Sequence, residues 1–201
     1  MRVLLTGFEP FVGYIENSSW AVVMQVVSQG IEGVELCTKQ LPVSFKRSAE
    51  ELRIAVKNFS PDVIVMLGQS AASDKVRLER IAINMMDAKN PDNDGVLPDE
   101  EPIYPNGRTA LFTQLPIKKL CASIAAQGVP VVVSNSCGLY VCNRLYYEAL
   151  NLCEHAPQMK AIFVHVPLYK GQVDTQDGMG MNLHDMATAI QVVITSCVTV
   201  I

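Results

Sequence analysis

The feature that most constrains this chain is a run of consecutive apolar residues, Val63-Ile64-Val65-Met66-Leu67, between Asp62 and Gly68. A strand with one wet face alternates apolar and polar residues, whereas a strand that is apolar throughout is covered on both faces, as in a parallel sheet between helices. Four further apolar runs predict strands, at residues 3–5, 34–41, 129–133 and 161–166. Helical patterns alternate with them, from Asn17 or Ser18 to the residue before Gly30, and at residues 44–59, 120–127, 140–154 and from 181 onward. This order predicts an α/β fold with three α/β/α layers and a mostly parallel, twisted central sheet.

Length and charge limit the classes of function. A chain of 201 residues suits one domain, residues 1–201, and is short for two. The net charge of −4 gives no electrostatic reason to bind nucleic acid or an anionic membrane. No apolar run approaches the roughly 20 residues of a membrane span, and the N-terminal apolar segment is too short for a signal sequence. We therefore expect a cytoplasmic protein whose partner is a small molecule or a peptide.

Cys142 is the first candidate for chemistry. It lies in the first turn of the helix expected at residues 140–154, after a strand and a short turn with Gly138. Unpaired backbone N–H groups at a helix start carry partial positive charge, which favours a thiolate over a thiol. Cys137, in the preceding turn, is the competing cysteine, and a redox pair of Cys137 and Cys142 is an alternative. The six cysteines have no zinc-ribbon spacing.

Two residues could assist this nucleophile. His165 lies in an otherwise apolar strand, where it is either a core histidine bonded to a carbonyl or a catalytic base. Residues 76–85 are expected to be extended, which places Glu79 on one face with Ile81 and Ile83. A carboxylate on an apolar face needs a partner, either an arginine in a structural ion pair or the histidine. Zinc bound by the cysteine, the histidine and this glutamate is a further alternative.

The candidate residues belong to stretches that follow strands. In open α/β sheets ligands bind outside the carboxyl ends of the strands. Four unusual stretches are expected there, namely residues 8–13, Gly68-Gln69-Ser70, residues 134–142 and His165-Val166-Pro167. Their shared position predicts one site, with Gln69 among its binding residues.

Several of these stretches together resemble a known family. The blocks, in chain order, are Phe8-Glu9-Pro10-Phe11, Leu78-Glu79-Arg80-Ile81-Ala82-Ile83-Asn84, Pro91-Asp92-Asn93, Leu115-Pro116-Ile117, Tyr140-Val141-Cys142-Asn143 and Phe163-Val164-His165-Val166-Pro167. They resemble pyroglutamyl peptidase type I, also called pyrrolidone-carboxylate peptidase, and the likeness covers essentially the whole chain.

The resemblance implies a cysteine peptidase that removes an N-terminal pyroglutamyl residue from peptides, uses no cofactor or metal, and assembles as a cytosolic homotetramer. It implies that Cys142 is the nucleophile, His165 the base and Glu79 the third member of the triad. It also implies a substrate pocket formed by Phe8 and Phe11, with Tyr140 and Val141 beside the nucleophile. An uncharged lactam ring fits aromatic walls with a few hydrogen-bonding groups.

The sequence departs from the family pattern at several loop positions. Val12 replaces a glycine, Ala71-Ala72-Ser73 replaces Gly-Gly-Arg, Lys89 replaces an arginine and Arg144 replaces a histidine. Bulkier residues limit how closely backbone approaches a ligand. These departures favour one alternative to the peptidase, a divergent homologue that acts on another N-terminally blocked peptide or amide. A second alternative is a non-enzymatic thiol sensor that uses Cys137 and Cys142.

Overall fold

The computed structural model describes residues 1–11, 13–172 and 180–198. The strands are β1 (Arg2–Phe8), β2 (Glu35–Leu41), β3 (Val63–Gln69), β4 (Val76–Glu79), β5 (Ile81–Ile83), β6 (Ala110–Phe112), β7 (Val131–Ser134) and β8 (Lys160–Val166). The helices are α1 (Ser18–Gln29), α2 (Arg47–Phe59), α3 (Ile117–Ala125), α4 (Val141–His155) and α5 (Leu183–Val198). None of the helices in the described ranges is long and apolar enough to cross a membrane.

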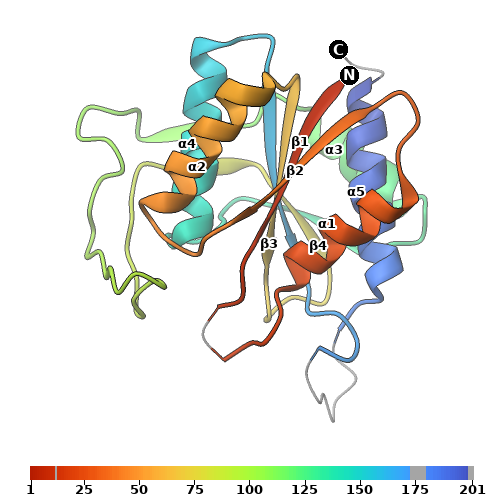
Figure 1. Ribbon diagram of the computed structural model, residues 1–201, viewed down its shortest axis with the longest axis horizontal. Helices are drawn as coiled ribbons and strands as arrows, with labels where there is room; N and C mark the ends of the chain where they lie inside the picture. Colours follow the sequence, from red (N-terminus) through yellow and green to blue (C-terminus); the bar gives the residue numbers. More distant parts are fainter. Residues whose placement is uncertain (12, 173–179, 199–201) are drawn as a thin grey trace.

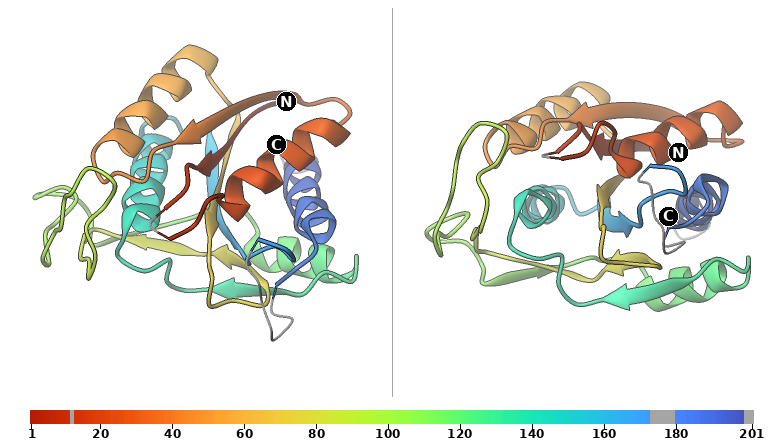
Figure 2. Two further views of the ribbon diagram at one scale, coloured as in Figure 1. Left: turned by 60° about the horizontal axis from the view of Figure 1, so that its bottom comes forward. Right: turned by 90° about the horizontal axis from the view of Figure 1, so that it is seen from below.

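A central sheet lies between two layers of helices (Figure 1). Its strand order is β2-β1-β3-β8-β4-β7. Helices α2 and α4 cover one face and α1, α3 and α5 cover the other, as the view from below shows (Figure 2). The predicted three-layer α/β fold is therefore confirmed.

Strand β3 shows why the sheet is covered twice. Val63, Val65 and Leu67 belong to the core beneath α1, α3 and α5, whereas Ile64 and Met66 belong to the core beneath α2 and α4. All five side chains are fully buried. Successive side chains on a strand point to opposite faces, so a strand with helices on both sides must be apolar at every position.

The sheet is mostly parallel, but its direction reverses once. Strands β1, β2, β3 and β8 run parallel to one another. Strand β4 pairs antiparallel with β8, and β7 follows β4 in parallel. The expectation that residues 134–142 simply follow a carboxyl end shared by all strands is therefore wrong, because β7 runs opposite to β8. The turn after β7 instead carries the chain back to the start of α4.

The predicted extended segment 76–85 is interrupted. β4 ends at Glu79, and β5 begins at Ile81 in a separate two-stranded sheet with β6. The predicted common face of Glu79, Ile81 and Ile83 is therefore not formed, since Ala82 is the buried residue of β5. Glu79 is nevertheless fully buried, as the expectation of a buried carboxylate required.

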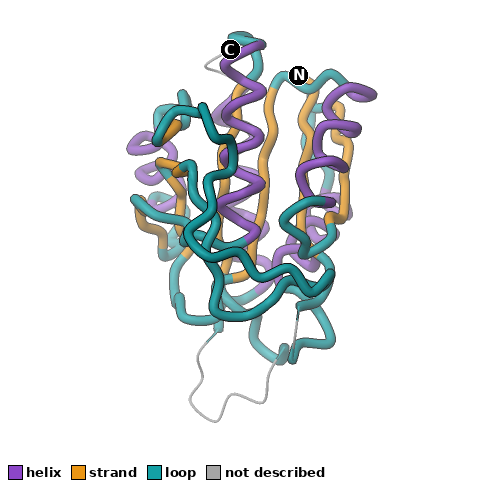
Figure 3. Tube along the Cα trace, turned by 90° about the vertical axis from the view of Figure 1, so that its left-hand side faces the viewer, coloured by secondary structure: helices purple, strands orange, loops and turns teal. Residues whose placement is uncertain are grey.

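A long connection, residues 84–109, separates β5 from β6. It runs outside α2 and α4 (Figures 1 and 3). Both termini lie at one end of the molecule, and the loops after β1 and before α4 lie at the other. The candidate residues Phe8, at the end of β1, and Cys142, at the start of α4, lie toward this second end.

Candidate active site

Cys142 occupies the first turn of α4, as predicted. The N-cap residue is Tyr140, whose side chain does not cap the helix. The first N–H of this helix to bond within it is that of Arg144, which donates to the Tyr140 carbonyl (3.2 Å). The N–H groups of residues 141–143 have no hydrogen-bond partner in the described part of the chain, so they can polarise a sulfur or bind an oxyanion. Gly138, with a φ of 78°, allows the turn that leads into the helix.

The sulfur of Cys142 lies against Gly68 at the end of β3. A Cβ atom at Gly68 would lie 3.2 Å from Cys142 Sγ and 2.7 Å from the Phe163 ring. Gly68 is also the register partner of His165 on the neighbouring strand β8. Only glycine leaves room for the Cys142 sulfur at this point of the sheet.

The start of α4 is fixed by Asn143. Its side-chain nitrogen donates to the carbonyls of Ile83 and Met85 (2.8 Å each), and its Oδ1 accepts from the N–H of Ile83 (3.0 Å). Asn143 is buried. Asn143 directly follows Cys142, so these bonds connect the start of α4 to the segment that follows Glu79. The sequence analysis did not predict this role of Asn143.

His165 and Glu79 form a buried pair. His165 Nδ1 lies 2.9 Å from Glu79 Oε1, and the two side chains are 10% and 0% exposed. Burial lowers the pKa of His165, but its hydrogen bonds with Cys142 and Glu79 raise it more, to about 9. The imidazole is therefore held as a cation at neutral pH, which suits an ion pair with a thiolate.

Glu79 has further neighbours. Arg77 Nε lies 3.5 Å from Glu79 Oε1, and the Tyr146 hydroxyl donates to the backbone carbonyl of Glu79 (2.9 Å). Glu79 Oε2 is buried and has no hydrogen-bond partner among the described residues. His165 and Arg77 therefore both contact the same carboxylate oxygen, Oε1.

Cys137 is not arranged as a nucleophile. It is buried, and burial together with the negative charges of Glu79 and Cys142 raises its pKa well above the usual thiol value. Its sulfur lies 3.5 Å from Asn143 Oδ1 and 3.8 Å from the Ile81 carbonyl. It therefore remains a thiol that packs beneath the start of α4.

The metal alternative does not match the geometry of the described residues. A metal needs ligand atoms that converge on one point. His165 instead directs Nδ1 at Glu79 and also bonds Cys142. No group of three or more histidine, cysteine or acidic side chains with metal-binding geometry occurs in the described part of the chain.

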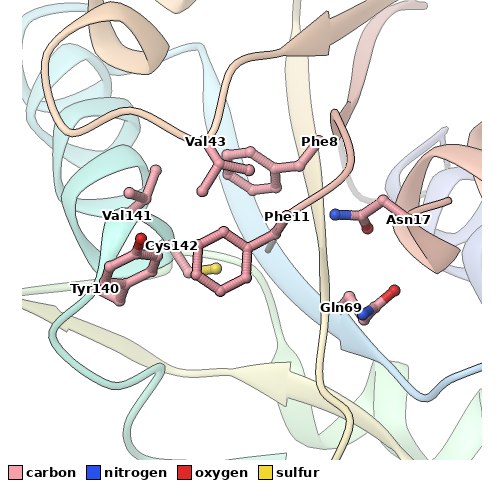
Figure 4. A pocket seen from close by; sticks show the side chains of 8 residues that line it. All are labelled: Phe8, Phe11, Asn17, Val43, Gln69, Tyr140, Val141 and Cys142. Carbon is pink, nitrogen blue, oxygen red and sulfur yellow. The ribbon is translucent and has the colours of Figure 1, made fainter. Parts of the chain in front are cut away.

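A pocket opens beside Cys142 (Figure 4). Its cavity measures about 160 Å³ and contains the five predicted binding residues, Phe8, Phe11, Gln69, Tyr140 and Val141, with Asn17 and Val43 in addition. The aromatic walls support one another, since the rings of Phe11 and Tyr140 lie 5.4 Å apart between centroids. None of the described residues that line this cavity is charged.

Gln69 is held in one orientation. Its Oε1 accepts from the backbone N–H of Ser18 (2.8 Å) and from Gln172 Nε2 (2.6 Å). The amide nitrogen of Gln69 lies on the Cys142 side in Figure 4 and has no partner among the described residues. Asn17, by contrast, uses its amide to cap α1 and to bond the Glu9 carbonyl (2.9 Å).

One edge of the pocket is braced by the connection between β5 and β6. The Tyr140 hydroxyl donates to the Pro91 carbonyl (3.0 Å), and Asn93 Nδ2 donates to Glu9 Oε1 (2.8 Å). Glu9 Oε1 also accepts from the N–H of Val43 (3.1 Å). Asn17 and Val43 were not predicted as pocket residues, because neither belongs to a stretch that looks unusual in the sequence.

The structure explains one departure from the family pattern. Arg144 NH1 lies 2.7 Å from Glu148 Oε2, and the buried Glu148 also accepts from Tyr104 (2.6 Å) and pairs with Arg53 (2.9 Å). Arg144, two residues after Cys142, thus belongs to a charge cluster in which the Glu148 carboxylate has three partners. Val12 lies outside the described residues, and nothing in the structure explains Lys89.

Comparisons with known proteins find relatives that match nearly the whole chain. The family model described as "Pyroglutamyl peptidase" matches residues 1–200. A pyrrolidone-carboxylate peptidase of Clavibacter michiganensis is 37% identical over 96% of this chain and 90% of its own, and one of Streptococcus pyogenes is 38% identical over 96% and 91%.

Solved structures are similar over the same length. The pyrrolidone carboxyl peptidase of Fervidobacterium islandicum has a TM-score of 0.94 at 35% identity and 99% coverage of both chains. The pyroglutamyl peptidase I of Bacillus amyloliquefaciens has a TM-score of 0.90 at 34% identity, with 95% of this chain and 93% of that chain covered.

Proposed function

This chain belongs to the pyroglutamyl peptidase family, and we propose that its Cys142, His165 and Glu79 are the residues that cleave the bond after an N-terminal pyroglutamyl residue. The chain is on this basis a cysteine peptidase whose substrates are peptides blocked by pyroglutamate. One observation supports this assignment most strongly, the buried pair of His165 and Glu79. The pair adjoins Cys142, which lies at the start of a helix and lines a pocket without charged side chains.

The pocket suits a lactam ring. Pyroglutamate carries no charge on its blocked nitrogen, and a pocket without charged side chains favours it over a peptide with a protonated amine. Phe8, Phe11 and Tyr140 supply aromatic walls for the ring. The free amide nitrogen of Gln69 can donate to the lactam carbonyl, since its oxygen is already engaged.

The reaction then follows from the protonation states. The Cys142 thiolate attacks the carbonyl carbon after the ring, and the resulting oxyanion is stabilised by free N–H groups of the first turn of α4. His165, which is protonated, gives its proton to the amine as the C–N bond breaks, so that a thioester remains on Cys142. Glu79 holds the imidazole orientation and stabilises its charge.

The second half of the reaction hydrolyses the thioester, and in it His165 accepts a proton instead of donating one. Neutral His165 takes a proton from water as the oxygen attacks the thioester carbonyl. The C–S bond breaks, pyroglutamate leaves, and the thiolate and imidazolium are restored. This cycle uses only groups of the chain and water, and no redox change occurs.

The proposal extends to organisation. Family membership supports a cytoplasmic homotetramer in which residues 1–201 form a single domain. Light scattering coupled to size-exclusion chromatography tests the assembly, and a mass of one or two chains would contradict it.

The assay is release of a fluorophore from a pyroglutamyl amide. The wild type is expected to release it, and Cys142→Ala is expected to lose at least about three orders of magnitude in kcat. Cys153→Ala, at a buried cysteine distant along α4, is the matched control and should keep its activity. Full activity of Cys142→Ala would refute the nucleophile.

Two additions to this assay separate the alternatives. Prolyl and acetyl-alanyl amides test substrate choice, and we expect neither to compete with pyroglutamyl amide, because the first is charged and the second lacks the ring. Equal cleavage of all three would support the divergent amidase instead. Activity is also expected to survive EDTA, and its loss on chelation would restore the zinc hypothesis.

A further inference from the structure

Arg77 is a charged neighbour of the catalytic residues that the mechanism above does not use. On β4 it lies two residues before Glu79, so both side chains belong to the same face of the strand. Arg77 is also the antiparallel register partner of His165. Side chains of such partners lie close together, typically about 4.5–5.5 Å between Cβ atoms.

The side chain of Arg77 makes contacts in two directions. Its Nε lies 3.5 Å from Glu79 Oε1. Its NH2 donates to Ser134 Oγ (2.8 Å) and lies 3.5 Å from the Ser136 carbonyl. Arg77 therefore joins the catalytic carboxylate to the turn that leads from β7 to the nucleophile.

The charges around the triad show what this arginine contributes. In the active form Glu79 and the Cys142 thiolate are negative, and His165 is positive. Cys137 and Tyr146 also face this group, but burial keeps both neutral by raising their pKa values. Without Arg77 the buried group would carry a net negative charge, which is costly away from water.

We propose that Arg77 is a positioning residue of the catalytic centre, whose guanidinium balances the second negative charge and holds Glu79 and the segment before Cys142 in place. This inference rests on the proposed function, because it takes Cys142 and His165 as the reacting pair. Arg77 itself does not touch the substrate in this proposal and acts through its contact with Glu79 and through its charge.

The charge has a definite effect on the pH profile. A positive charge opposite His165 disfavours the imidazolium, and the same charge favours the thiolate and the Glu79 carboxylate. Removing it should move both limbs of the kcat/KM profile to higher pH. A unit charge at this range, screened by the 37% exposure of Arg77, corresponds to a shift of about half a pH unit.

The test compares pH profiles of four proteins. Arg77→Gln is expected to move both limbs upward by about half a unit, whereas Arg77→Lys, which keeps the charge, should stay near the wild type. Arg108→Gln is the matched control, since Arg108 is 72% exposed and pairs with Glu154 at the far end of α4. A merely structural role of Arg77 would lower activity and leave the limbs in place.

A second readout does not depend on peptidase activity. The rate of Cys142 alkylation by iodoacetamide, followed by mass spectrometry, reports thiolate formation, and its profile should move upward with Arg77→Gln. If the wild type cleaves no pyroglutamyl amide but this shift occurs, the proposed function fails and the role of Arg77 stands.

Ser134→Ala is a second variant that keeps the proposal testable if Arg77→Gln does not fold. It keeps the charge and removes the 2.8 Å tether of the guanidinium, and it should move the limbs in the same direction by a smaller amount. Limbs and alkylation profiles that stay at wild-type values in both Arg77→Gln and Ser134→Ala overturn the proposal. An equal shift in Arg108→Gln overturns it as well.

Discussion

Glu79→Gln tests the buried pair most directly. The substitution keeps the shape of the side chain and replaces the carboxylate that lies 2.9 Å from His165 Nδ1. The pKa of His165 is about 9 in the wild type, because the hydrogen bonds with Cys142 and Glu79 outweigh the effect of burial. Without the carboxylate, burial acts against a weaker hydrogen bond, so the pKa must fall.

The size of the fall follows from the energy of such a bond. A hydrogen bond to a charged group contributes about 1.5–3 kcal/mol, and about 1.4 kcal/mol corresponds to one pKa unit. We therefore expect the alkaline limb of kcat/KM to move from about 9 to between about 7 and 8. The limb exists because only protonated His165 can give a proton to the leaving amine.

The assay is hydrolysis of a pyroglutamyl amide from pH 5 to pH 10, with Glu35→Gln as a control at an exposed carboxylate paired with Arg2. The pH dependence of the free energy of unfolding is an independent measurement of the same pKa. A raised pKa in the folded state stabilises the fold fully below pH about 6.5, and this contribution disappears as the pH rises through about 9. Urea unfolding should show this loss in the wild type and less of it in Glu79→Gln. An alkaline limb that stays near 9 in Glu79→Gln would refute the reasoning.

Four other changes have definite expected outcomes. Gly68→Ala should lower kcat more than tenfold, because the added Cβ would lie 3.2 Å from Cys142 Sγ, and alkylation of Cys142 should slow with it. Phe11→Ala should raise KM about tenfold at nearly constant kcat through the loss of an aromatic wall, and a lower kcat with constant KM would contradict this. Gln172→Ala releases one bond that orients the pocket glutamine, so KM should rise a few-fold for pyroglutamyl amides. Glu148→Gln should lower the free energy of unfolding by about 3–5 kcal/mol in urea titrations, because two arginines lose their buried partner, and an unchanged midpoint would argue against that cluster.

The sequence predicted the layers, and it singled out three candidate residues, for physical reasons that can be named. The five consecutive apolar residues of β3, from Val63 to Leu67, predict a strand covered on both faces. Cys142 was a candidate because a cysteine at a helix start is near unpaired N–H groups. His165 was a candidate because it is a polar residue in an otherwise apolar strand. Glu79 was predicted to be a buried carboxylate from the alternation of side chains along one strand. It is buried, but that strand ends at Glu79 and does not continue through Arg80.

The remaining features depend on contacts that a linear pattern does not encode. Asn17 and Val43 reach the pocket because separate loops converge there, and their local sequences are typical of a helix cap and a strand end. Arg144 departs from the family pattern, yet its partner Glu148 also pairs with Arg53, which lies far away in the sequence. Only the fold brings the arginines of two helices to one carboxylate.

The antiparallel direction of β4 brings the proposed triad next to the pocket. Because β4 enters beside His165 and leaves beside Phe163, Arg77 and Glu79 approach the histidine from the end at which the substrate binds. The chain then passes through β5, where Asn143 anchors the nucleophile's helix, and continues to the segment that braces Tyr140. One continuous stretch thus contacts the base, the start of α4 and the pocket wall in succession. Displacements in this stretch should therefore affect proton transfer and substrate binding together, whereas changes in α1 should affect binding alone.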